Sequence, residues 1–272
     1  MSDTKILYPV SNVTHEAFLA QKRQRRHFIT CMRLFVLLII LGGWEISARI
    51  HLIDAFIFSS PSRICNVMLQ MIADYSLFYH LGITIGETLI SFILVLIFGT
   101  LIAMSLWWCR SAADILEPYF VILNSLPKTA LAPILIVWLG NNVKTIIVCG
   151  VTMAIFSTII NLYTAFIHID HDKILLIQTL GGSRKDILRY IVLPSSLSAI
   201  VSNLKVNIGL CLVGVIIGEF LAANAGLGYL IIYGSQVFRL DYVMLSIIIL
   251  CILAMLLYQL LSLVEKKYDA KH

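Results

Sequence analysis

The chain has 272 residues, of which 60% are hydrophobic and 13% are charged, and its mean hydropathy is +0.93. A water-soluble domain carries about twice that share of charge, so the composition excludes an ordinary soluble fold and indicates an all-α integral membrane protein. The apolar stretches are continuous rather than alternating, which argues against a transmembrane β-barrel. The net charge of +5 requires no nucleic-acid partner, because the topology described below accounts for it.

The first apolar run begins after a polar tail over residues 1–27. It extends over about 28–49 without a small-residue cleavage site, so we expect it to be retained as the first of six transmembrane helices. The other five are predicted over residues 79–108, 116–140, 143–167, 196–223 and 240–264. Each is long enough for a hydrocarbon core of about 30 Å, at about 1.5 Å of helix per residue.

Lysine and arginine are distributed unevenly over the loops. If the N-terminus is cytoplasmic, 14 of them lie on the inner side and 4 on the outer side, and Lys128 and Lys205 fall within spans. The positive-inside rule therefore predicts that both termini are cytoplasmic, including a short tail over 267–272. In the outer segment 50–78, Ser60–Pro61 is followed by apolar residues at helical spacing, which predicts a short helix at the outer surface.

The inner loop over residues 168–195 is more polar and more patterned than the other loops. Asp170 and Asp172 can cap a first short helix, Gly181–Gly182 interrupts it, and Ser183 can cap a second one. One interpretation is an amphipathic segment that rests on the inner leaflet. The other is a docking surface for a cytoplasmic partner, which the glycine elbow favours.

The second half of this loop carries a family pattern. Gly181 is followed, after about a dozen residues, by the apolar–Leu–Pro end Val192–Pro194. This pattern resembles the cytoplasmic signature loop of binding-protein-dependent ABC importer permeases. That family usually has Glu-Ala-Ala before the glycine, whereas this chain has Leu175-Leu176-Ile177, so the resemblance is intact only from Leu180 to Pro194.

Two longer segments extend the resemblance. "SLPKTALAPILIVWLG" at 125–140 and "GEFLAANAGLGYLIIYGSQVF" at 218–238 are similar to segments of the nitrate/sulfonate/taurine permease group, and the similarity covers roughly residues 58–266. Glu87 departs from the group, which commonly has a basic residue there. The resemblance implies a type I ABC importer permease architecture in a bacterial cell membrane, with a core transmembrane domain of five helices over 79–266.

The resemblance also implies partners. The loop would be a coupling helix held in a groove of a separate ATPase, and it would involve Asp172, Leu175, Leu180, Gly181, Gly182, Ser183, Asp186, Leu188 and Pro194. The chain has no GxxxxGK[ST] phosphate loop, so we expect it to be a transport subunit and not an enzyme. ATP and Mg would bind to two partner ATPase subunits, with no cofactor on this chain. A second permease copy, forming a homodimer, and an extracytoplasmic substrate-binding protein complete the expected assembly.

Prolines indicate a break in the third span. Pro127 and Pro133 remove backbone donors at membrane depth, which is tolerated where the helix is buried in protein or lines a cavity. Lys128, beside this break, is either a snorkelling or ion-paired lysine, with Glu87 or Glu219 as its partner, or a lining charge that helps an anion or polar solute pass. The residues expected to line the pathway are Asn124, Lys128, Thr129, Lys205, Asn207 and Glu219.

Small residues and single polar side chains complete the pattern. Gly82 with Gly86, and Gly214 with Gly218, have the spacing that lets helices approach closely. The six cysteines are scattered singly and are interpreted as packing residues, with no metal site expected. His80, His168 and His171 flank spans and are interpreted as interfacial residues.

The favoured function is import of a small polar solute, an anion such as a sulfonate, taurine or nitrate. A thiamine or pyrimidine precursor carried by the same family is the first alternative. A secondary transporter is a second alternative, but the spans show no obvious inverted repeat and no acidic relay. A membrane-embedded enzyme is not favoured either, because no HExxH or GxSxG pattern occurs. The sequence leaves open the substrate and whether the dimer is made of identical chains.

Overall fold

The computed structural model describes residues 15–269, and within that range the chain is helical and contains no strand. Five helices are long and apolar enough to cross a membrane, or six if one bent helix pair counts as a single span. The all-α membrane fold predicted from the sequence is therefore confirmed. Parts of the two predicted tails, residues 1–14 and 270–272, lie outside the described range.

The contacts divide the chain into two units, residues 1–62 and 63–272. The first unit contains α1 (His15–Arg49) and the four-residue helix α2 (Ala55–Phe58). Helix α1 begins well before the expected residue 28 because the polar stretch ahead of its apolar part contains no glycine or proline to stop it. Its membrane-compatible part is Arg23–Arg49.

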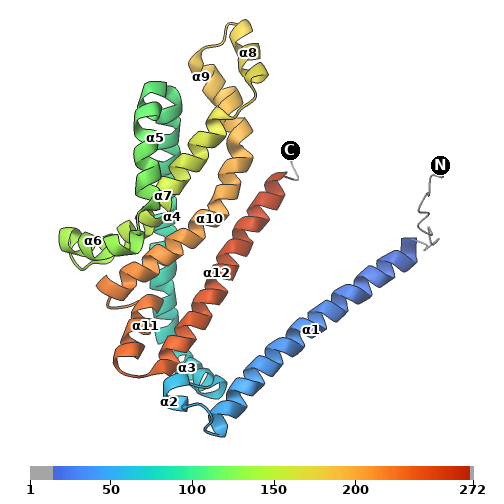
Figure 1. Ribbon diagram of the computed structural model, residues 1–272, viewed down its shortest axis with the longest axis vertical. Helices are drawn as coiled ribbons and strands as arrows, with labels where there is room; N and C mark the ends of the chain where they lie inside the picture. Colours follow the sequence, from blue (N-terminus) through green and yellow to red (C-terminus); the bar gives the residue numbers. More distant parts are fainter. Residues whose placement is uncertain (1–14, 270–272) are drawn as a thin grey trace, which may run out of the picture. The chain divides into compact units, whose positions relative to one another are not determined.

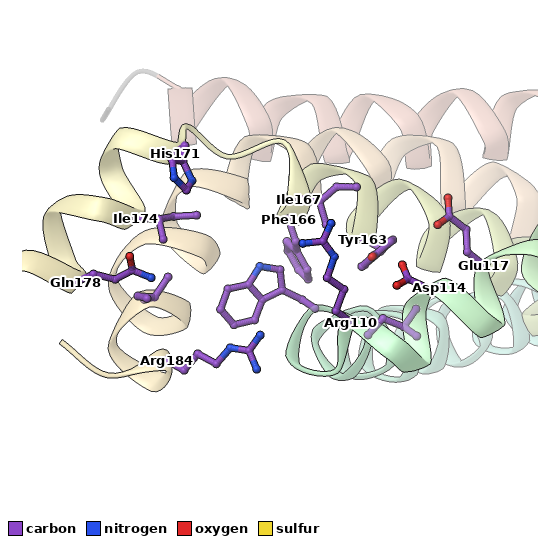
Figure 2. A pocket seen from close by; sticks show the side chains of 13 residues that line it. Arg110, Asp114, Glu117, Tyr163, Phe166, Ile167, His171, Ile174, Gln178 and Arg184 are labelled. Atoms are coloured by element: carbon purple, nitrogen blue, oxygen red, sulfur yellow. The ribbon is translucent and has the colours of Figure 1, made fainter.

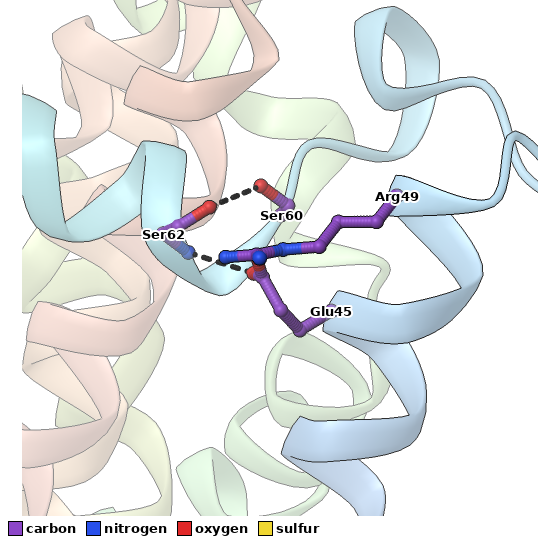
Figure 3. Close-up of polar contacts among 4 residues, drawn as sticks. All are labelled: Glu45, Arg49, Ser60 and Ser62. Carbon is purple, nitrogen blue, oxygen red and sulfur yellow. Dashed lines mark hydrogen bonds and ion pairs between the residues drawn. The ribbon is translucent and has the colours of Figure 1, made fainter.

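A carboxylate organises the end of the first unit (Figure 3). Glu45 Oε1 accepts from Nε of Arg49 at 2.8 Å, and Glu45 Oε2 accepts from the backbone N–H of Ser62 at 3.0 Å. Ser62 lies in the first turn of α3 (Pro61–Ala73), where backbone N–H groups have no partner within the helix. The predicted helix start at Ser60–Pro61 is thus present, and Glu45 satisfies one of its free donors.

Three long helices form the centre of the second unit: α4 (Ser76–Trp108), α7 (Val143–Ile167) and α10 (Leu193–Ala222). Helix α12 (Leu240–Asp269) packs against α10 and α11 (Leu227–Gln236). Figure 1 shows α5 (Arg110–Ser125), α8 (His171–Thr179) and α9 (Arg184–Ile187) near one end of this bundle, and α11 near the opposite end.

Glycines set the close approach of α10 to α7. A Cβ added to Gly214 would lie 2.6 Å from the carbonyl oxygen of Cys149, and one on Gly218 would lie 2.9 Å from Cα of Ile146. Gly150 on α7 is as tightly placed, since a Cβ there would meet Oγ of Ser91 at 2.5 Å. At Gly82 and Gly86 on α4, by contrast, an added Cβ meets no atom of residues 15–269 within 4 Å.

The expected third span over 116–140 is broken. Helix α5 begins earlier, at Arg110, and ends at Ser125; the 3₁₀ turn η1 (Lys128–Leu131) and the short helix α6 (Ala132–Leu139) then turn away by 88°. Leu126, which precedes Pro127, has the extended conformation that a following proline imposes, with φ −63° and ψ 145°. The break therefore has the local cause that the sequence predicts.

Candidate coupling loop and pathway

The inner loop folds as two capped helices joined by a turn. Asp170 accepts from the backbone N–H of Asp172 at 3.1 Å, which caps α8. Ser183 caps α9 and forms a reciprocal capping box with Asp186, whose carboxylate accepts from the Ser183 backbone N–H at 2.8 Å. The bonds from the Ser183 side chain and backbone hold the pKa of Asp186 below its ordinary value, so the capped geometry is retained at neutral pH.

The turn between the two helices depends on its glycines. Gly181 has φ +77°, a left-handed conformation that favours glycine, and the N–H of Gly182 donates to the carbonyl oxygen of Ile177 at 2.8 Å. A Cβ on Gly182 would lie 2.4 Å from Cγ2 of Ile177 and 2.8 Å from that carbonyl oxygen. The elbow is thus a tight helix end that positions α9 directly after α8.

The loop presents apolar side chains outward on one side and packs on the other. Leu180 at the elbow is 75% exposed, and Leu175 and Leu176 on α8 are exposed as well. Ile187 is buried and Leu188 is half-buried against a cluster of side chains from α4, α5 and α7. The coupling residues assigned from the resemblance therefore divide into an outward group and a group that anchors the loop.

The loop continues into the fifth span without interruption. Helix α9 leads into η2 (Leu188–Val192), a π-helical turn in which the N–H of Leu193 donates to the carbonyl oxygen of Leu188. Pro194 follows in the first turn of α10. Because proline has no N–H to donate, a wider turn ahead of it changes the local hydrogen-bonding pattern without ending the helix.

A cavity of about 520 Å³ lies between this loop and the ends of α4, α5 and α7 (Figure 2). Its charged lining includes Arg110, Asp114 and Glu117 from α5 and Arg184 from α9. The guanidinium of Arg184 also donates to the carbonyl oxygen of Trp108 at 3.1 Å, which ties α9 to the end of α4. Leu180 is not among the residues that line the cavity.

The lysine at the broken span is tied to the helix α7 behind it. Nζ of Lys128 donates to Oδ1 of Asn124 at 3.0 Å and to the carbonyl oxygen of Met153 at 3.2 Å. These partners take the place of the glutamate that one interpretation of the sequence expected. Thr129 lies next to it and is exposed.

Replacing Lys128 with methionine should weaken the attachment of the broken third span to α7. The expected loss is about 1–3 kcal/mol, because two hydrogen bonds from a charged donor disappear and the apolar stem is kept. The measurement is the thermal midpoint of purified protein. Lys128→Arg keeps a charged donor, so its thermal midpoint should fall less. An equal fall in the midpoint of both variants would argue that neither bond contributes to stability.

The remaining pathway candidates lie in α10, at different depths. Lys205 forms an ion pair with Glu265 on α12, a partner that the sequence reading did not anticipate. Asn207 is buried, and neither polar atom of its side chain has a hydrogen-bond partner among the described residues. Glu219, close to the other end of α10, is 1% exposed.

Three successive backbone N–H groups are capped by side chains at the turn that precedes α11. The N–H of Gly226 donates to Nδ1 of His80 at 3.0 Å, and that of Leu227 donates to Oγ1 of Thr84 at 2.8 Å. The N–H of Gly228 donates to Oε2 of Glu219 at 2.5 Å. We call residues 223–228 the outer turn. His80 is thus part of this network, whereas the sequence indicated only an interfacial residue.

The comparison with protein families decides the identity of this fold. Residues 95–269, more than half of the chain, match the model of the binding-protein-dependent transport system inner membrane component. The chain belongs to this family. The match includes the inner loop, the broken span and the outer turn, so these features are parts of a transport permease, and the resemblance to importer permeases is confirmed.

Relatives of this permease are named for several solutes. It is 29% identical over 196 residues to the formylaminopyrimidine transport permease protein ThiX of Halalkalibacterium halodurans, covering 72% of this chain and 76% of the relative. It is 23% identical over 242 residues to the taurine transport system permease protein TauC of Escherichia coli, covering 87% and 88%. A Bacillus subtilis relative is named as a putative aliphatic sulfonates transport permease.

Solved structures agree on the fold. The permease aligns with a chain of the MetNI methionine ABC transporter, in an inward-facing conformation, with a TM-score of 0.63 and 18% identity, covering 71% of this chain and 96% of that one. A chain of an amino acid ABC transporter aligns with a TM-score of 0.58, 19% identity and coverage of 73% and 97%. The type I importer architecture expected from the sequence is confirmed.

Proposed function

We propose that this permease forms the translocation pathway of an ATP-driven importer for a small polar solute, with ATP hydrolysis on a separate chain. The observation that carries the proposal is the inner loop of a family member: a rigid, doubly capped helical elbow that exposes Leu175, Leu176 and Leu180. Exposed leucines beside the charged residues of the loop have the composition of a protein-docking surface, with an apolar centre and a polar rim.

Two cytoplasmic ATPase subunits are the proposed partners at this loop, and ATP and Mg belong to them. A second copy of this chain, as a homodimer, would complete the pathway. The exposed apolar face of α6 supports this part of the proposal, since Val137 is 82% exposed and Trp138 is 75% exposed. Both termini would be cytoplasmic by the distribution of lysine and arginine, and a binding protein would deliver the solute from the other side.

The favoured solute is a small anion such as a sulfonate or taurine. Lys128 supports this choice because it is a cation at the broken span, and the relatives named for taurine and aliphatic sulfonates support it too. A pyrimidine precursor is the second candidate, which the relative named for formylaminopyrimidine favours. Binding measurements on the partner substrate-binding protein, with taurine and formylaminopyrimidine as the two ligands, would decide between them.

Co-purification of an ATPase from detergent-solubilised membranes tests the docking surface. Leu180→Glu should lose the ATPase, with co-purification falling by at least about tenfold, because a charge would replace an exposed apolar contact at the elbow. Leu180 is preferred to Leu188 as the test position, since Leu188 packs against the core and its replacement would also disturb folding.

Leu69→Glu is the matched control. Leu69 on α3 is 61% exposed, and it belongs to the outer segment, so this variant should retain the ATPase. If the wild-type permease brings down no ATPase, or if Leu180→Glu retains it fully, the loop is not the docking surface. A secondary transporter would then become the leading function.

A further inference from the structure

Two glutamates from different spans meet in the interior of the second unit. Glu87 on α4 is 4% exposed and Glu219 on α10 is 1% exposed. Glu87 lies one helical turn after Thr84 on the same face of α4, and the hydroxyl of Thr84 donates to Glu219 at 2.6 Å, so the two carboxyl groups face each other. Buried carboxylates are stable only when hydrogen-bonded or paired with a cation, so each one requires a partner.

Glu219 has its partners. Oε1 accepts from Oγ1 of Thr84 at 2.6 Å, and Oε2 accepts from the backbone N–H of Gly228 at 2.5 Å. A carboxylate that accepts from several donors is stabilised in its charged form, as happens at a helix N-terminus.

Glu87 has no such donors. Neither of its oxygens has a hydrogen-bond partner within residues 15–269. The carboxylate of Glu219, which faces it, already accepts through both oxygens and has no proton to offer. Two ionised carboxylates cannot bond to each other and would repel strongly in a buried environment. The contact becomes a hydrogen bond only when one of the two groups carries a proton.

The surrounding groups offer no other compensation. The ion pairs formed by described side chains leave out both glutamates. The titratable neighbours are His80 on α4, which binds Gly226; Cys149 on α7, whose Cβ lies 3.3 Å from the Cβ position at Gly218; and Tyr229 on α11. None of these supplies a positive charge to Glu87 in the observed geometry.

We propose that Glu87 and Glu219 form a buried binding site for a single proton. Glu87 is the neutral carboxylic acid and donates its proton to the carboxylate of Glu219. The assignment follows from the donors, since Glu219 has two that stabilise a negative charge and Glu87 has none among the described residues. The bound proton satisfies the carboxyl group of Glu87 and connects α4, through Glu219, to the outer turn.

The proton also stabilises the packing of α4 and α10 against the outer turn. A Cβ on Gly226 or Gly228 would lie within 2.8 Å of the Glu219 side chain, so the outer turn packs closely against this side chain. If Glu87 became charged, repulsion would push the Glu219 carboxylate against the turn or pull α4 away from α10. Protonation of Glu87 therefore stabilises the observed close packing of α4, α10 and the outer turn.

Infrared spectroscopy of the purified full-length permease, combined with thermal unfolding, tests the site without a transport assay. The wild-type protein at neutral pH should show a carboxylic acid carbonyl band, which is lost in Glu87→Gln. Because glutamine is neutral and can donate an N–H to Glu219, the thermal midpoint of this variant should stay within about 2 °C of wild type. Glu87→Ala removes the donor, so its thermal midpoint should lie clearly below those of wild type and Glu87→Gln.

Glu117→Gln is the control substitution, because Glu117 is an exposed glutamate of α5, away from the glutamate pair. It should leave the carboxylic acid band unchanged. Raising the pH from mildly acidic to mildly alkaline should lower the midpoint of wild type and not that of Glu87→Gln. The proposal is overturned if the band persists in Glu87→Gln, or if Glu87→Gln is as unstable as Glu87→Ala.

Discussion

Replacing Gly214 with leucine is expected to lower the thermal midpoint of the purified permease by roughly 10 °C, equivalent to about 3 kcal/mol. The added Cβ would lie 2.6 Å from the carbonyl oxygen of Cys149 and 2.8 Å from Cα of Gly150. Both obstacles are backbone atoms of α7, so no side-chain rotation can relieve the clash. Helices α7 and α10 must separate, and the central contact of the second unit is lost.

Gly209→Leu is the matched control for this result. Gly209 lies on the same helix, α10, and an added Cβ there meets no atom of the described residues within 4 Å. The intrinsic helix preference gained from glycine to leucine is the same at both positions. If the two variants unfold at similar temperatures, close packing at Gly214 does not hold the bundle together.

Gly226→Val should strongly reduce solute uptake while the ATPase stays bound. Gly226 has φ +118°, a conformation that a β-branched residue adopts only with strain, and its Cβ would lie 2.4 Å from Cδ of Glu219. The outer turn must move, and the bonds from Gly226 to His80 and from Gly228 to Glu219 break with it. We expect solute uptake to fall by at least about tenfold, which corresponds to a cost of about 1.4 kcal/mol.

The proposed ATPase docking surface lies on a different part of the second unit, which makes the effect of Gly226→Val separable from a general folding defect. Solute uptake in cells should fall while co-purification of the ATPase is unchanged. Gly86→Val on α4 is the control, since an added Cβ there has no contact within 4 Å in the part of the chain that the structure describes. A Gly226→Val permease with normal uptake would contradict a role for the outer turn in transport.

The parts of the fold that follow from local chemistry could be predicted from the sequence. The caps at Asp170 and Ser183, the elbow at Gly181 and the break at Pro127 depend on residues only a few positions apart. The bounds of α1 and α5 could not be predicted as well, because polar helix-forming residues extend a helix beyond its apolar part.

The outer turn could not be predicted, because its partners are far apart in the sequence. Thr84 and Leu227 are 143 positions apart, and His80 and Gly226 are 146 positions apart. A histidine at the start of a span has the pattern of an interfacial residue, and only the packing of α4 against the turn gives it a partner. Glu87 was recognisable as unusual from the sequence, but its pairing with Glu219 depends on how α4 and α10 meet.

The unbroken path from α9 through η2 into α10 has a mechanical consequence. From Arg184 to Ala222 the chain is helical throughout, and at about 1.5 Å per residue this corresponds to a helical path of roughly 60 Å. The path starts just after the glycine elbow and ends at the residue that precedes the outer turn. Because no loop interrupts it, the proposed docking surface and the glutamate pair are joined by continuous helix and not by a flexible connection.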